Sequence, residues 1–310
     1  MATFKNYLSL VKFSHTIFAM PFAMIGFFLG FIGLKQRLSS AWWGNIHALS
    51  PDKITAIENY KLIILKFFLV LVCMITARSA AMAFNRYLDR SFDAKNPRTA
   101  IREIPKGIIS ANNALLFTIT CCVIFIGACF FINSICFYLS PVALFVVLFY
   151  SYTKRFTPLC HLVLGLGLSL APIGAYLAVT GKFDVLPVLF SLAVIFWVSG
   201  FDIIYALQDV EFDRSQKLFS IPAWLGKKSA LRVSEIFHLI SAACVIVAGI
   251  YGQFHWLYWI GIAVFIGMLI YQHSLVKPND LSKVNIAFMT ANGIASVVFG
   301  ILVISDLMIL

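Results

Sequence analysis

The sequence has 310 residues, of which 61% are hydrophobic and only 12% are charged. This composition excludes an ordinary soluble domain and indicates an integral membrane protein that crosses the bilayer many times. The net charge of +11 is carried by short segments between apolar runs, so we expect no nucleic-acid partner, and the lipid bilayer or an anionic ligand is favoured instead.

Apolar runs long enough to cross a bilayer as helices of about 20 residues follow one another along the chain. The runs lack the alternation of barrel strands, and helices satisfy every backbone polar group in lipid. The predicted class is all-α, a polytopic membrane protein with nine transmembrane helices around a central cavity, forming one domain over residues 1–310. The expected spans are 15–34, 62–84, 113–132, 135–152, 159–179, 185–206, 234–252, 254–272 and 285–306.

Most of the 24 Lys and Arg residues fall on one side of these spans, in the N-terminal segment and in alternate loops. The positive-inside rule assigns that side to the cytoplasm. We therefore expect a multi-pass protein of the plasma (inner) membrane. Its two long acidic loops, 85–112 and 207–233, would face the cytoplasm.

The loop after the second span contains the sequence NRYLDRSFDAKNPRTAIREIPKG. Its Asn85, Asp89 and Asp93 are spaced by four residues, so a helix that continues past the membrane surface would project all three from one face. Carboxylate and amide oxygens are hard ligands that suit Mg2+. The spacing predicts a metal position here.

The loop after the sixth span repeats the D-x-x-F-D pattern within FDIIYALQDVEFDRSQ. Asp202, Tyr205, Asp209 and Asp213 again have helical spacing. Like charges four residues apart repel each other, so two such pairs that face each other need a compensating cation. The repeat also indicates a weak internal duplication, roughly 1–155 and 156–310, with the site between the halves.

Basic side chains near both motifs could hold phosphate oxygens, since Arg offers forked donors and Lys a point charge. The expected set is Arg98, Arg102, Lys106, Lys154 and Arg155. Arg78, within the second span, is a costly intramembrane charge that could contact a diphosphate, an acceptor carboxylate or a structural carboxylate.

The cysteines and histidines give weaker signals. The seven cysteines lie in or beside apolar runs without metal-type spacing, so we interpret them as small core residues and expect no disulfide framework. His161, His238, His255 and His273 lie at span ends and are interpreted as interfacial residues.

The two acidic motifs resemble the N-x-x-x-D-x-x-x-D and D-x-x-x-D motifs of the UbiA superfamily of membrane prenyltransferases. The resemblance covers essentially the whole chain, and the longer stretches are similar to the 4-hydroxybenzoate polyprenyltransferase branch. The stretch YALQDVEFDR…SIP also resembles the sequences of relatives in the futalosine route to menaquinone. One departure follows the second motif: many relatives read G-x-K-S, whereas KLFS places Lys217 and Phe219 at the first and third positions.

The resemblance implies Mg2+-dependent transfer of a polyprenyl group from polyprenyl diphosphate to the ring of a hydroxyaromatic acid in ubiquinone or menaquinone biosynthesis. It implies that Asp202 and Tyr205 act on the acceptor, and that the basic set with Arg78 holds the diphosphate or acceptor. The implied metal ligands are Asn85, Asp89 and Asp93 for one ion and Asp209 and Asp213 for a second.

Other functions stay open from the sequence. Within the superfamily, prenylation of 1,4-dihydroxy-6-naphthoate, haem O synthesis and chlorophyll or naphthoate prenylation are alternatives. A cation or phosphate transporter predicts acidic residues near span middles, whereas these acids cluster at span ends. A non-catalytic lipid-binding or scaffold protein has no need for two matched aspartate pairs.

Overall fold

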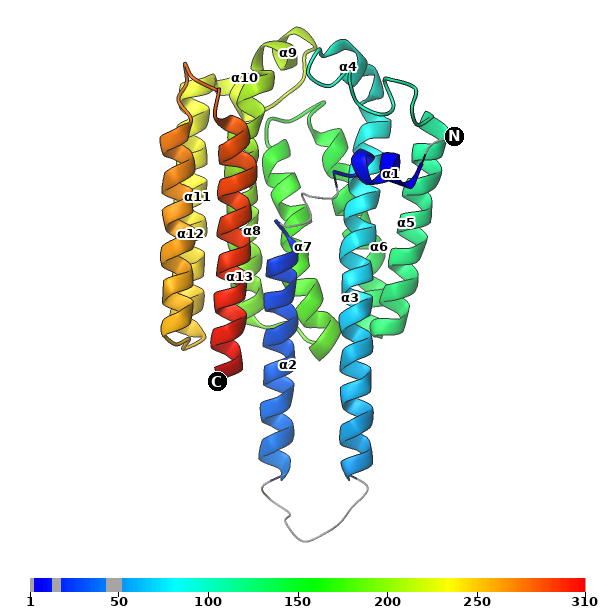
Figure 1. The fold of residues 1–310 in the computed structure, drawn as a ribbon, viewed down its shortest axis with the longest axis vertical. Coiled ribbons are helices and arrows are strands. Elements are labelled where there is room, and N and C mark those ends of the chain that lie inside the picture. The colour runs from blue at the N-terminus through cyan, green and yellow to red at the C-terminus, as the bar shows by residue number, and fades with distance from the viewer. Residues whose placement is uncertain (1–2, 13–17, 43–51, 310) are drawn as a thin grey trace.

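The computed structural model describes residues 3–12, 18–42 and 52–309, and within them it is a bundle of helices along one long axis (Figure 1). The long helices are α2 Met20–Trp42, α3 Asp52–Leu88, α5 Ala111–Ile132, α6 Ser134–Thr153, α7 Cys160–Thr180, α8 Val185–Ala206, α11 Lys227–Tyr251, α12 Trp256–Leu275 and α13 Asn292–Ile309. The shorter helical elements are α1 Phe4–Leu10, α4 Arg90–Lys95, η2 Leu207–Asp209, α9 Val210–Ser215, α10 Ile221–Leu225 and the π-helical η3 Ile286–Ala291.

In this described part, eight helices are long and apolar enough to cross a membrane, and they correspond to the second to ninth predicted spans. The first predicted span corresponds to α2, whose described apolar stretch is Met20–Leu34; residues 13–17 lie outside the description. At 1.5 Å per residue that stretch covers about 22 Å, less than the hydrocarbon core of about 30 Å. The all-α polytopic class is therefore confirmed. Among the described residues eight helices meet the length requirement, so the predicted count of nine is not confirmed.

Polar caps mark where the chain turns at the ends of the bundle. Ser110 and Asn133 begin α5 and α6 by accepting the backbone N–H of the residue three positions later. Gly181 ends α7 in the left-handed conformation, with φ of 64°. Each cap satisfies a backbone group that the helix itself leaves unpaired.

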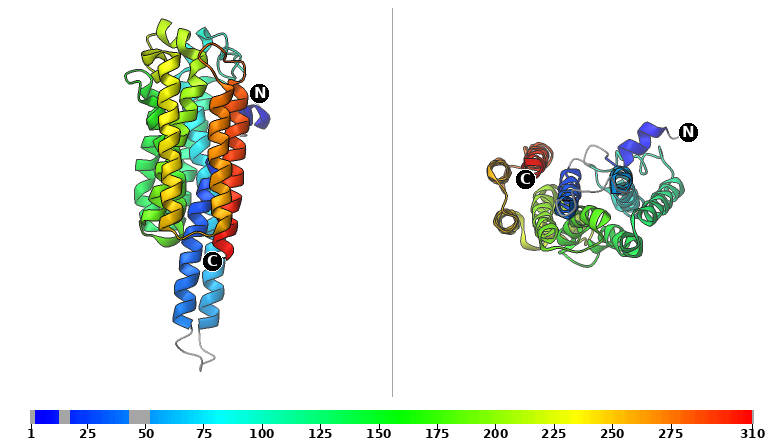
Figure 2. Two further views of the ribbon diagram at one scale, coloured as in Figure 1. Left: turned by 90° about the vertical axis from the view of Figure 1, so that its left-hand side faces the viewer. Right: turned by 90° about the horizontal axis from the view of Figure 1, so that it is seen from below.

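Seen from below, the helices follow a curved row from α13 and α12 through α11, α8, α7 and α6 to α5 and α3 (Figure 2). Helix α2 stands inside this curve and packs against α7 and α13. The close approach to α7 depends on Gly26, where a Cβ would lie 2.0 Å from the carbonyl oxygen of Pro172.

The two sides of the bundle are packed differently. A dense aromatic core, with Phe22, Trp197, Phe265 and Phe299 at its centre, lies among α2, α8, α12 and α13. A cavity of about 400 Å³ lies instead between α3, α5, α6 and α7. The short helices α4, α9 and α10 lie together at one end of the bundle, above both regions (Figure 1).

Candidate active site

The two acidic motifs have the same local structure. Helix α3 ends at Leu88, Asp89 adopts φ −91° and ψ 9°, and the six-residue α4 follows. In the second motif η2 ends at Asp209, which adopts φ −104° and ψ 4°, and the six-residue α9 follows. This sparsely populated backbone region is common among active-site residues. The predicted straight helical stripe is therefore bent at the first aspartate of each motif, and the second aspartate becomes buried.

The first pair lies at the junction of α3 and α4 and has basic partners from two segments. Asp89 accepts hydrogen bonds from Asn85 Nδ2 at 3.1 Å and from Arg155 Nη2 at 3.2 Å. Asp93, which is 6% exposed, pairs with Arg102 Nη1 at 2.6 Å. Its second oxygen, Oδ2, is buried and has no hydrogen-bond partner in the described part.

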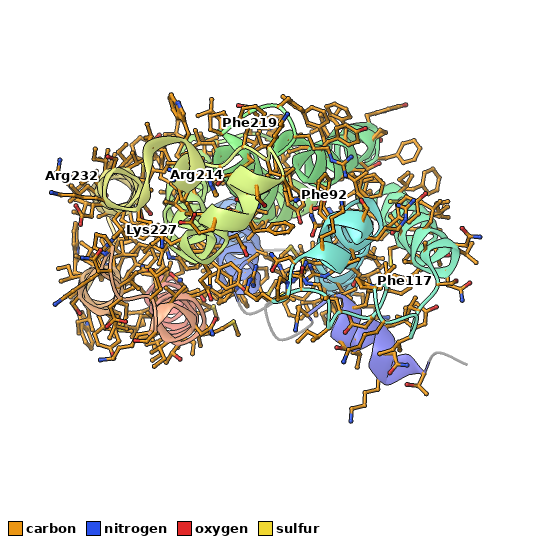
Figure 3. The ribbon with its side chains drawn as sticks, turned by 90° about the horizontal axis from the view of Figure 1, so that it is seen from above. Phe92, Phe117, Arg214, Phe219, Lys227 and Arg232 are labelled. Carbon is orange, nitrogen blue, oxygen red and sulfur yellow. The ribbon has the colours of Figure 1, made fainter. Side chains whose placement is uncertain are left out.

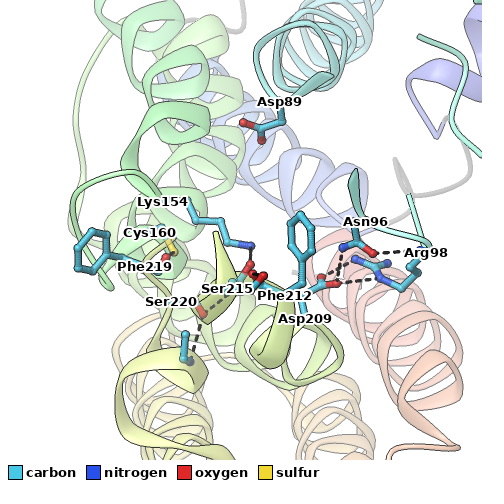
Figure 4. Close-up of polar contacts among 12 residues, drawn as sticks. Asp89, Asn96, Arg98, Lys154, Cys160, Asp209, Phe212, Ser215, Phe219 and Ser220 are labelled. Atoms are coloured by element: carbon cyan, nitrogen blue, oxygen red, sulfur yellow. Dashed lines mark hydrogen bonds and ion pairs between the residues drawn. The ribbon is translucent and has the colours of Figure 1, made fainter. Parts of the chain in front are cut away.

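Arg98 joins the two acidic loops. Its Nε and Nη2 donate to the two carboxylate oxygens of Asp209 at 3.0 and 2.5 Å, and its Nη1 donates to the Tyr205 hydroxyl at 3.0 Å. Asn96 Nδ2 also donates to Asp209, at 3.2 Å (Figure 4). The forked contact fixes the loop after α4 against η2, the short helix that follows α8.

Asp213 is completely buried and is held by α6 and α10. Lys154 Nζ lies 2.7 Å from its Oδ1, and the Ser220 hydroxyl donates to its Oδ2 at 2.9 Å (Figure 4). Figure 3 shows α4, which carries Phe92, and α9, which carries Arg214, side by side at this end of the bundle. All five predicted carboxylate and amide ligands are thus brought to one end.

The four aspartates form four ion pairs, each with a different cation, so the formal charge of the set is zero. Burial raises the pKa of Asp89, and the hydrogen bond from Arg155 opposes that rise. Burial alone would lower the pKa of Lys154, but the Asp213 carboxylate outweighs burial and raises that pKa. Desolvation and pairing therefore act against each other at Asp89 and at Lys154.

The donor set fits Mg2+ bound together with a phosphate ligand. It consists of carboxylate and amide oxygens, which Mg2+ prefers, and Asp93 Oδ2 is a buried acceptor with no partner in the described part. Over the described ranges, no three His, Cys, Asp or Glu side chains are grouped closely enough to chelate an ion alone. Mg2+ usually takes one or two carboxylates and completes its shell with water and phosphate oxygens.

Asp202 lies in α8, ahead of Asp209 in the chain. It has a partner that the sequence did not predict. His161 Nδ1 lies 2.7 Å from Asp202 Oδ2, and the backbone N–H of Ile221 donates to His161 Nε2 at 3.3 Å. His161 is 2% exposed and His238 is 3% exposed, so their interpretation as interfacial residues was wrong. His255, by contrast, is exposed at a helix end.

The remaining predicted cations lie apart from the ion pairs. Arg78 lines the cavity, and over the described ranges it makes no ion pair; its Nε is buried without a hydrogen-bond partner. Tyr150 also lines the cavity and is within electrostatic range of Arg78, Asp89 and Asp202. The Lys106 side chain is exposed and joins no ion pair with a described residue.

Three buried polar residues of the site were missed from the sequence. Asn96 and Ser220 each contact a motif aspartate, and Arg86, 6% exposed, is within electrostatic range of Asp93. The only signal for Asn96 was its place in NPRT, two residues before Arg98. Ser220 is the serine of the stretches KLFS and SIP, but neither stretch indicates its partner, which is fixed by the fold.

The departure after the second motif leaves the acidic site intact. Lys217 has φ of 54°, the left-handed region that glycine favours. The Phe219 side chain is 45% exposed and points away from Asp209 (Figure 4). Its backbone N–H donates to the Lys154 carbonyl at 2.7 Å, so residue 219 supports the site through its main chain.

Several known proteins are similar to this chain over most of its length. The profile of the UbiA prenyltransferase family matches residues 37–294. The chain is 29% identical over 231 residues to a 4-hydroxybenzoate octaprenyltransferase of Francisella tularensis subsp. mediasiatica, covering 74% of this chain and 81% of that protein. It is 28% identical over 246 residues to the protein of the same name from Shewanella pealeana, covering 79% and 85%.

Solved structures share the fold. The apo structure of a UbiA homolog from Aeropyrum pernix K1 superposes with a TM-score of 0.74 at 26% identity, covering 95% of this chain and 97% of that one. A UbiA homolog from Archaeoglobus fulgidus bound to DMAPP and Mg2+ superposes with a TM-score of 0.68 at 20% identity, covering 98% and 100%. The family profile alone covers well over half of the chain. This chain therefore belongs to the UbiA prenyltransferase family.

Proposed function

We propose that this enzyme transfers a polyprenyl group from its diphosphate to the ring of a 4-hydroxybenzoate-type acceptor, in a Mg2+-dependent step of respiratory quinone synthesis. The observation that carries the proposal is the pair of matched aspartate motifs, joined at one end of the bundle by Arg98 and neutralised by four cations. The names of the relatives and the DMAPP and Mg2+ in a structural neighbour support it.

The donor diphosphate is assigned to the space between the two motifs. Asn85, Asp89 and Asp93 would hold one Mg2+, and Asp209 and Asp213 a second. The bound ions would supply Lewis-acid stabilisation of the departing diphosphate. The cations that now pair with the aspartates carry the donors that phosphate oxygens need, and these are Arg98, Arg102, Lys154 and Arg155.

The acceptor is assigned to the boundary between the acidic end and the cavity. The Arg78 guanidinium has no carboxylate partner in the described part, so it can bind the acceptor's carboxylate. Tyr150 lines the same cavity as Arg78 and interacts electrostatically with Arg78 and Asp202, which supports placing a small aromatic acid near these residues. The apolar cavity would take the prenyl chain and exclude water from the reacting carbon.

The bond changes follow from this placement. The allylic C–O bond of the donor breaks and its electron pair leaves with the diphosphate. The ring of the acceptor supplies the electron pair for the new C–C bond, and the ring proton at that carbon passes to the Asp202 carboxylate. Tyr205 is assigned to hold Arg98, since its hydroxyl accepts from that guanidinium.

A membrane assay tests the proposal. Membranes containing the protein are given a long-chain polyprenyl diphosphate and Mg2+, with 4-hydroxybenzoate and 1,4-dihydroxy-6-naphthoate as parallel acceptors. Prenylated 4-hydroxybenzoate, detected by mass, is the expected product, and chelation of Mg2+ abolishes it. Product from the naphthoate alone would move the enzyme to the futalosine route, and diphosphate release with no prenylated acceptor would contradict both acceptors.

A further inference from the structure

We propose that His161 is a positioning residue that holds Asp202 in place to receive the ring proton; this inference rests on the proposed aromatic prenylation. His161 lies in the first turn of α7, and Asp202 lies near the end of α8, 41 residues later in the chain. The Nδ1–Oδ2 distance of 2.7 Å is that of a charge-assisted hydrogen bond.

The contacts of the imidazole fix its tautomer. The backbone N–H of Ile221 points at Nε2 and can only donate, so Nε2 must carry a lone pair. The ring proton therefore resides on Nδ1 and is donated to Asp202. A doubly protonated ring would set two N–H groups against each other at a position that is 2% exposed. His161 thus donates from Nδ1 to Asp202, while its Nε2 is occupied by the backbone N–H of Ile221.

This contact leaves one carboxylate oxygen of Asp202 available. Oδ2 accepts from His161, whereas Oδ1 has no hydrogen-bond partner among the residues that the structure describes, and the side chain is 24% exposed. Loss of the Nδ1 donor would leave the carboxylate free to rotate and would remove the hydrogen bond that stabilises its anion. Both changes weaken a base that must lie within hydrogen-bond reach of the ring proton.

The same histidine ties Asp202 to the second metal motif. Ile221, whose N–H binds His161, follows Ser220, whose hydroxyl binds Asp213. The Ser199 hydroxyl donates to the His161 carbonyl at 3.0 Å and holds the start of α7 against α8. The position of Asp202 is therefore set relative to the diphosphate site through a short, buried chain of contacts.

Two replacements separate the two contacts of the ring. The amide of His161→Asn reaches the Nδ1 position and keeps a donor to Asp202, while the amide of His161→Gln reaches the Nε2 position and keeps an acceptor for Ile221. The full-length protein and both variants are assayed in membranes with polyprenyl diphosphate, Mg2+ and the acceptor that the wild type prenylates. The acceptor is supplied with hydrogen or with deuterium at the ring carbon that is prenylated.

We expect His161→Gln to lower kcat about 10-fold or more, because a well-placed base contributes roughly 10²–10⁴. Its KM for the diphosphate donor should stay within about twofold, and a primary isotope effect should appear as proton removal becomes slow. His161→Asn should stay within about threefold of wild type in kcat.

The positioning role would be overturned if His161→Gln kept the kcat of the wild type. It would also be overturned if both variants lost kcat equally, with a raised KM for the donor and no isotope effect. These results leave the proposed reaction standing, because wild type still forms product. Wild-type protein that prenylates neither acceptor overturns the proposed reaction, and the positioning role falls with it.

Discussion

Each motif aspartate has a basic partner of its own, and this arrangement has a physical reason. A buried carboxylate without a partner costs several kcal/mol, and four of them at one end of a bundle would also repel each other. A separate cation pairs with each carboxylate and offsets both the cost of burial and the repulsion between carboxylates. The same cations are then in place for a ligand whose own charge is negative.

Removal of one aspartate from either motif should abolish turnover. Asp89→Ala or Asp209→Ala is expected to lower kcat by about 10²-fold or more, since each removes a charged ligand of a metal that stabilises the leaving group. Diphosphate release and prenylated product are both measured, and the unfolding midpoint in detergent checks the fold. Asp280→Ala is the matched control, because Asp280 is exposed and, among the described residues, its side chain forms hydrogen bonds with Ser282 alone. Near-normal turnover in both motif variants would remove the metal assignment.

The pH dependence of Mg2+ binding should reflect Asp89. Burial raises the pKa of Asp89, and Mg2+ binds the deprotonated carboxylate, so Mg2+ affinity falls as pH drops through that raised pKa. The loss should therefore begin above the ordinary aspartate value of about 3.9. Arg155→Ala removes the cation that opposes the rise and should shift the loss to still higher pH.

The measurement for Asp89 is the Mg2+ concentration for half-maximal turnover across a pH series. Arg90→Ala serves as control, because Arg90 is exposed and lies over the Tyr87 ring rather than on a carboxylate. An Arg155→Ala profile that coincides with wild type would show that Asp89 does not limit Mg2+ binding.

At the scale of elements, the sequence predicted the long helices well and the short ones poorly. Long apolar runs leave helices as the main way to satisfy the backbone in lipid, so spans such as 185–206 matched α8 directly. The bends at Asp89 and Asp209 depend on one residue's φ and ψ, which no periodic pattern reports. The contact between His161 and Asp202 joins two helices 41 residues apart, and neither residue's neighbours indicate it.

The loop after α9 should gain stability from glycine at position 217. Lys217 has φ of 54°, where a residue with a Cβ costs roughly 1–2 kcal/mol relative to the ordinary helical region. Lys217→Gly is expected to raise the free energy of unfolding by about 0.5–1 kcal/mol, partly offset by the greater freedom of glycine in the unfolded chain. Lys217→Ala keeps the strain and should change little. Unfolding midpoints in detergent compare the three proteins, and equal gains in both variants would point to lost charge rather than backbone relief.

The whole molecule divides its tasks between two regions. The aromatic core among α2, α8, α12 and α13 fixes the frame, while the cavity between α3, α5, α6 and α7 leaves room for an apolar ligand. The two motifs share a bend and a six-residue helix, and an internal duplication over roughly 1–155 and 156–310 stays a prediction. Arg98 then joins one half to the other through Asp209.

The basic end of the bundle should face the cytoplasm. Lys and Arg are concentrated in the loops at the end that carries α4, α9 and α10, and the positive-inside rule predicts this orientation. Ser229 lies at the start of α11 at this end, and Lys182 lies between α7 and α8 at the opposite end; both residues are exposed. The test introduces a cysteine at each position in turn, as Ser229→Cys and Lys182→Cys. In intact cells a membrane-impermeant maleimide should label Lys182→Cys and spare Ser229→Cys until the cells are lysed. The reverse pattern would invert the orientation.

The cavity should set how long a prenyl chain the enzyme accepts. Gly174 of α7 lines the cavity, and a Cβ at this position would meet no atom within 4 Å, so Gly174→Leu fills the cavity without a clash in the backbone. We expect this variant to lose turnover with a long-chain polyprenyl diphosphate and to keep it with a five-carbon donor, because only the long chain needs the part of the cavity that the leucine side chain fills. Gly127→Leu in α5 is the matched control, since its Cβ also meets open space but Gly127 does not line the cavity. Competition between the two donors, followed by product mass, measures the shift directly, and equal loss with both donors would place the chain elsewhere in the membrane.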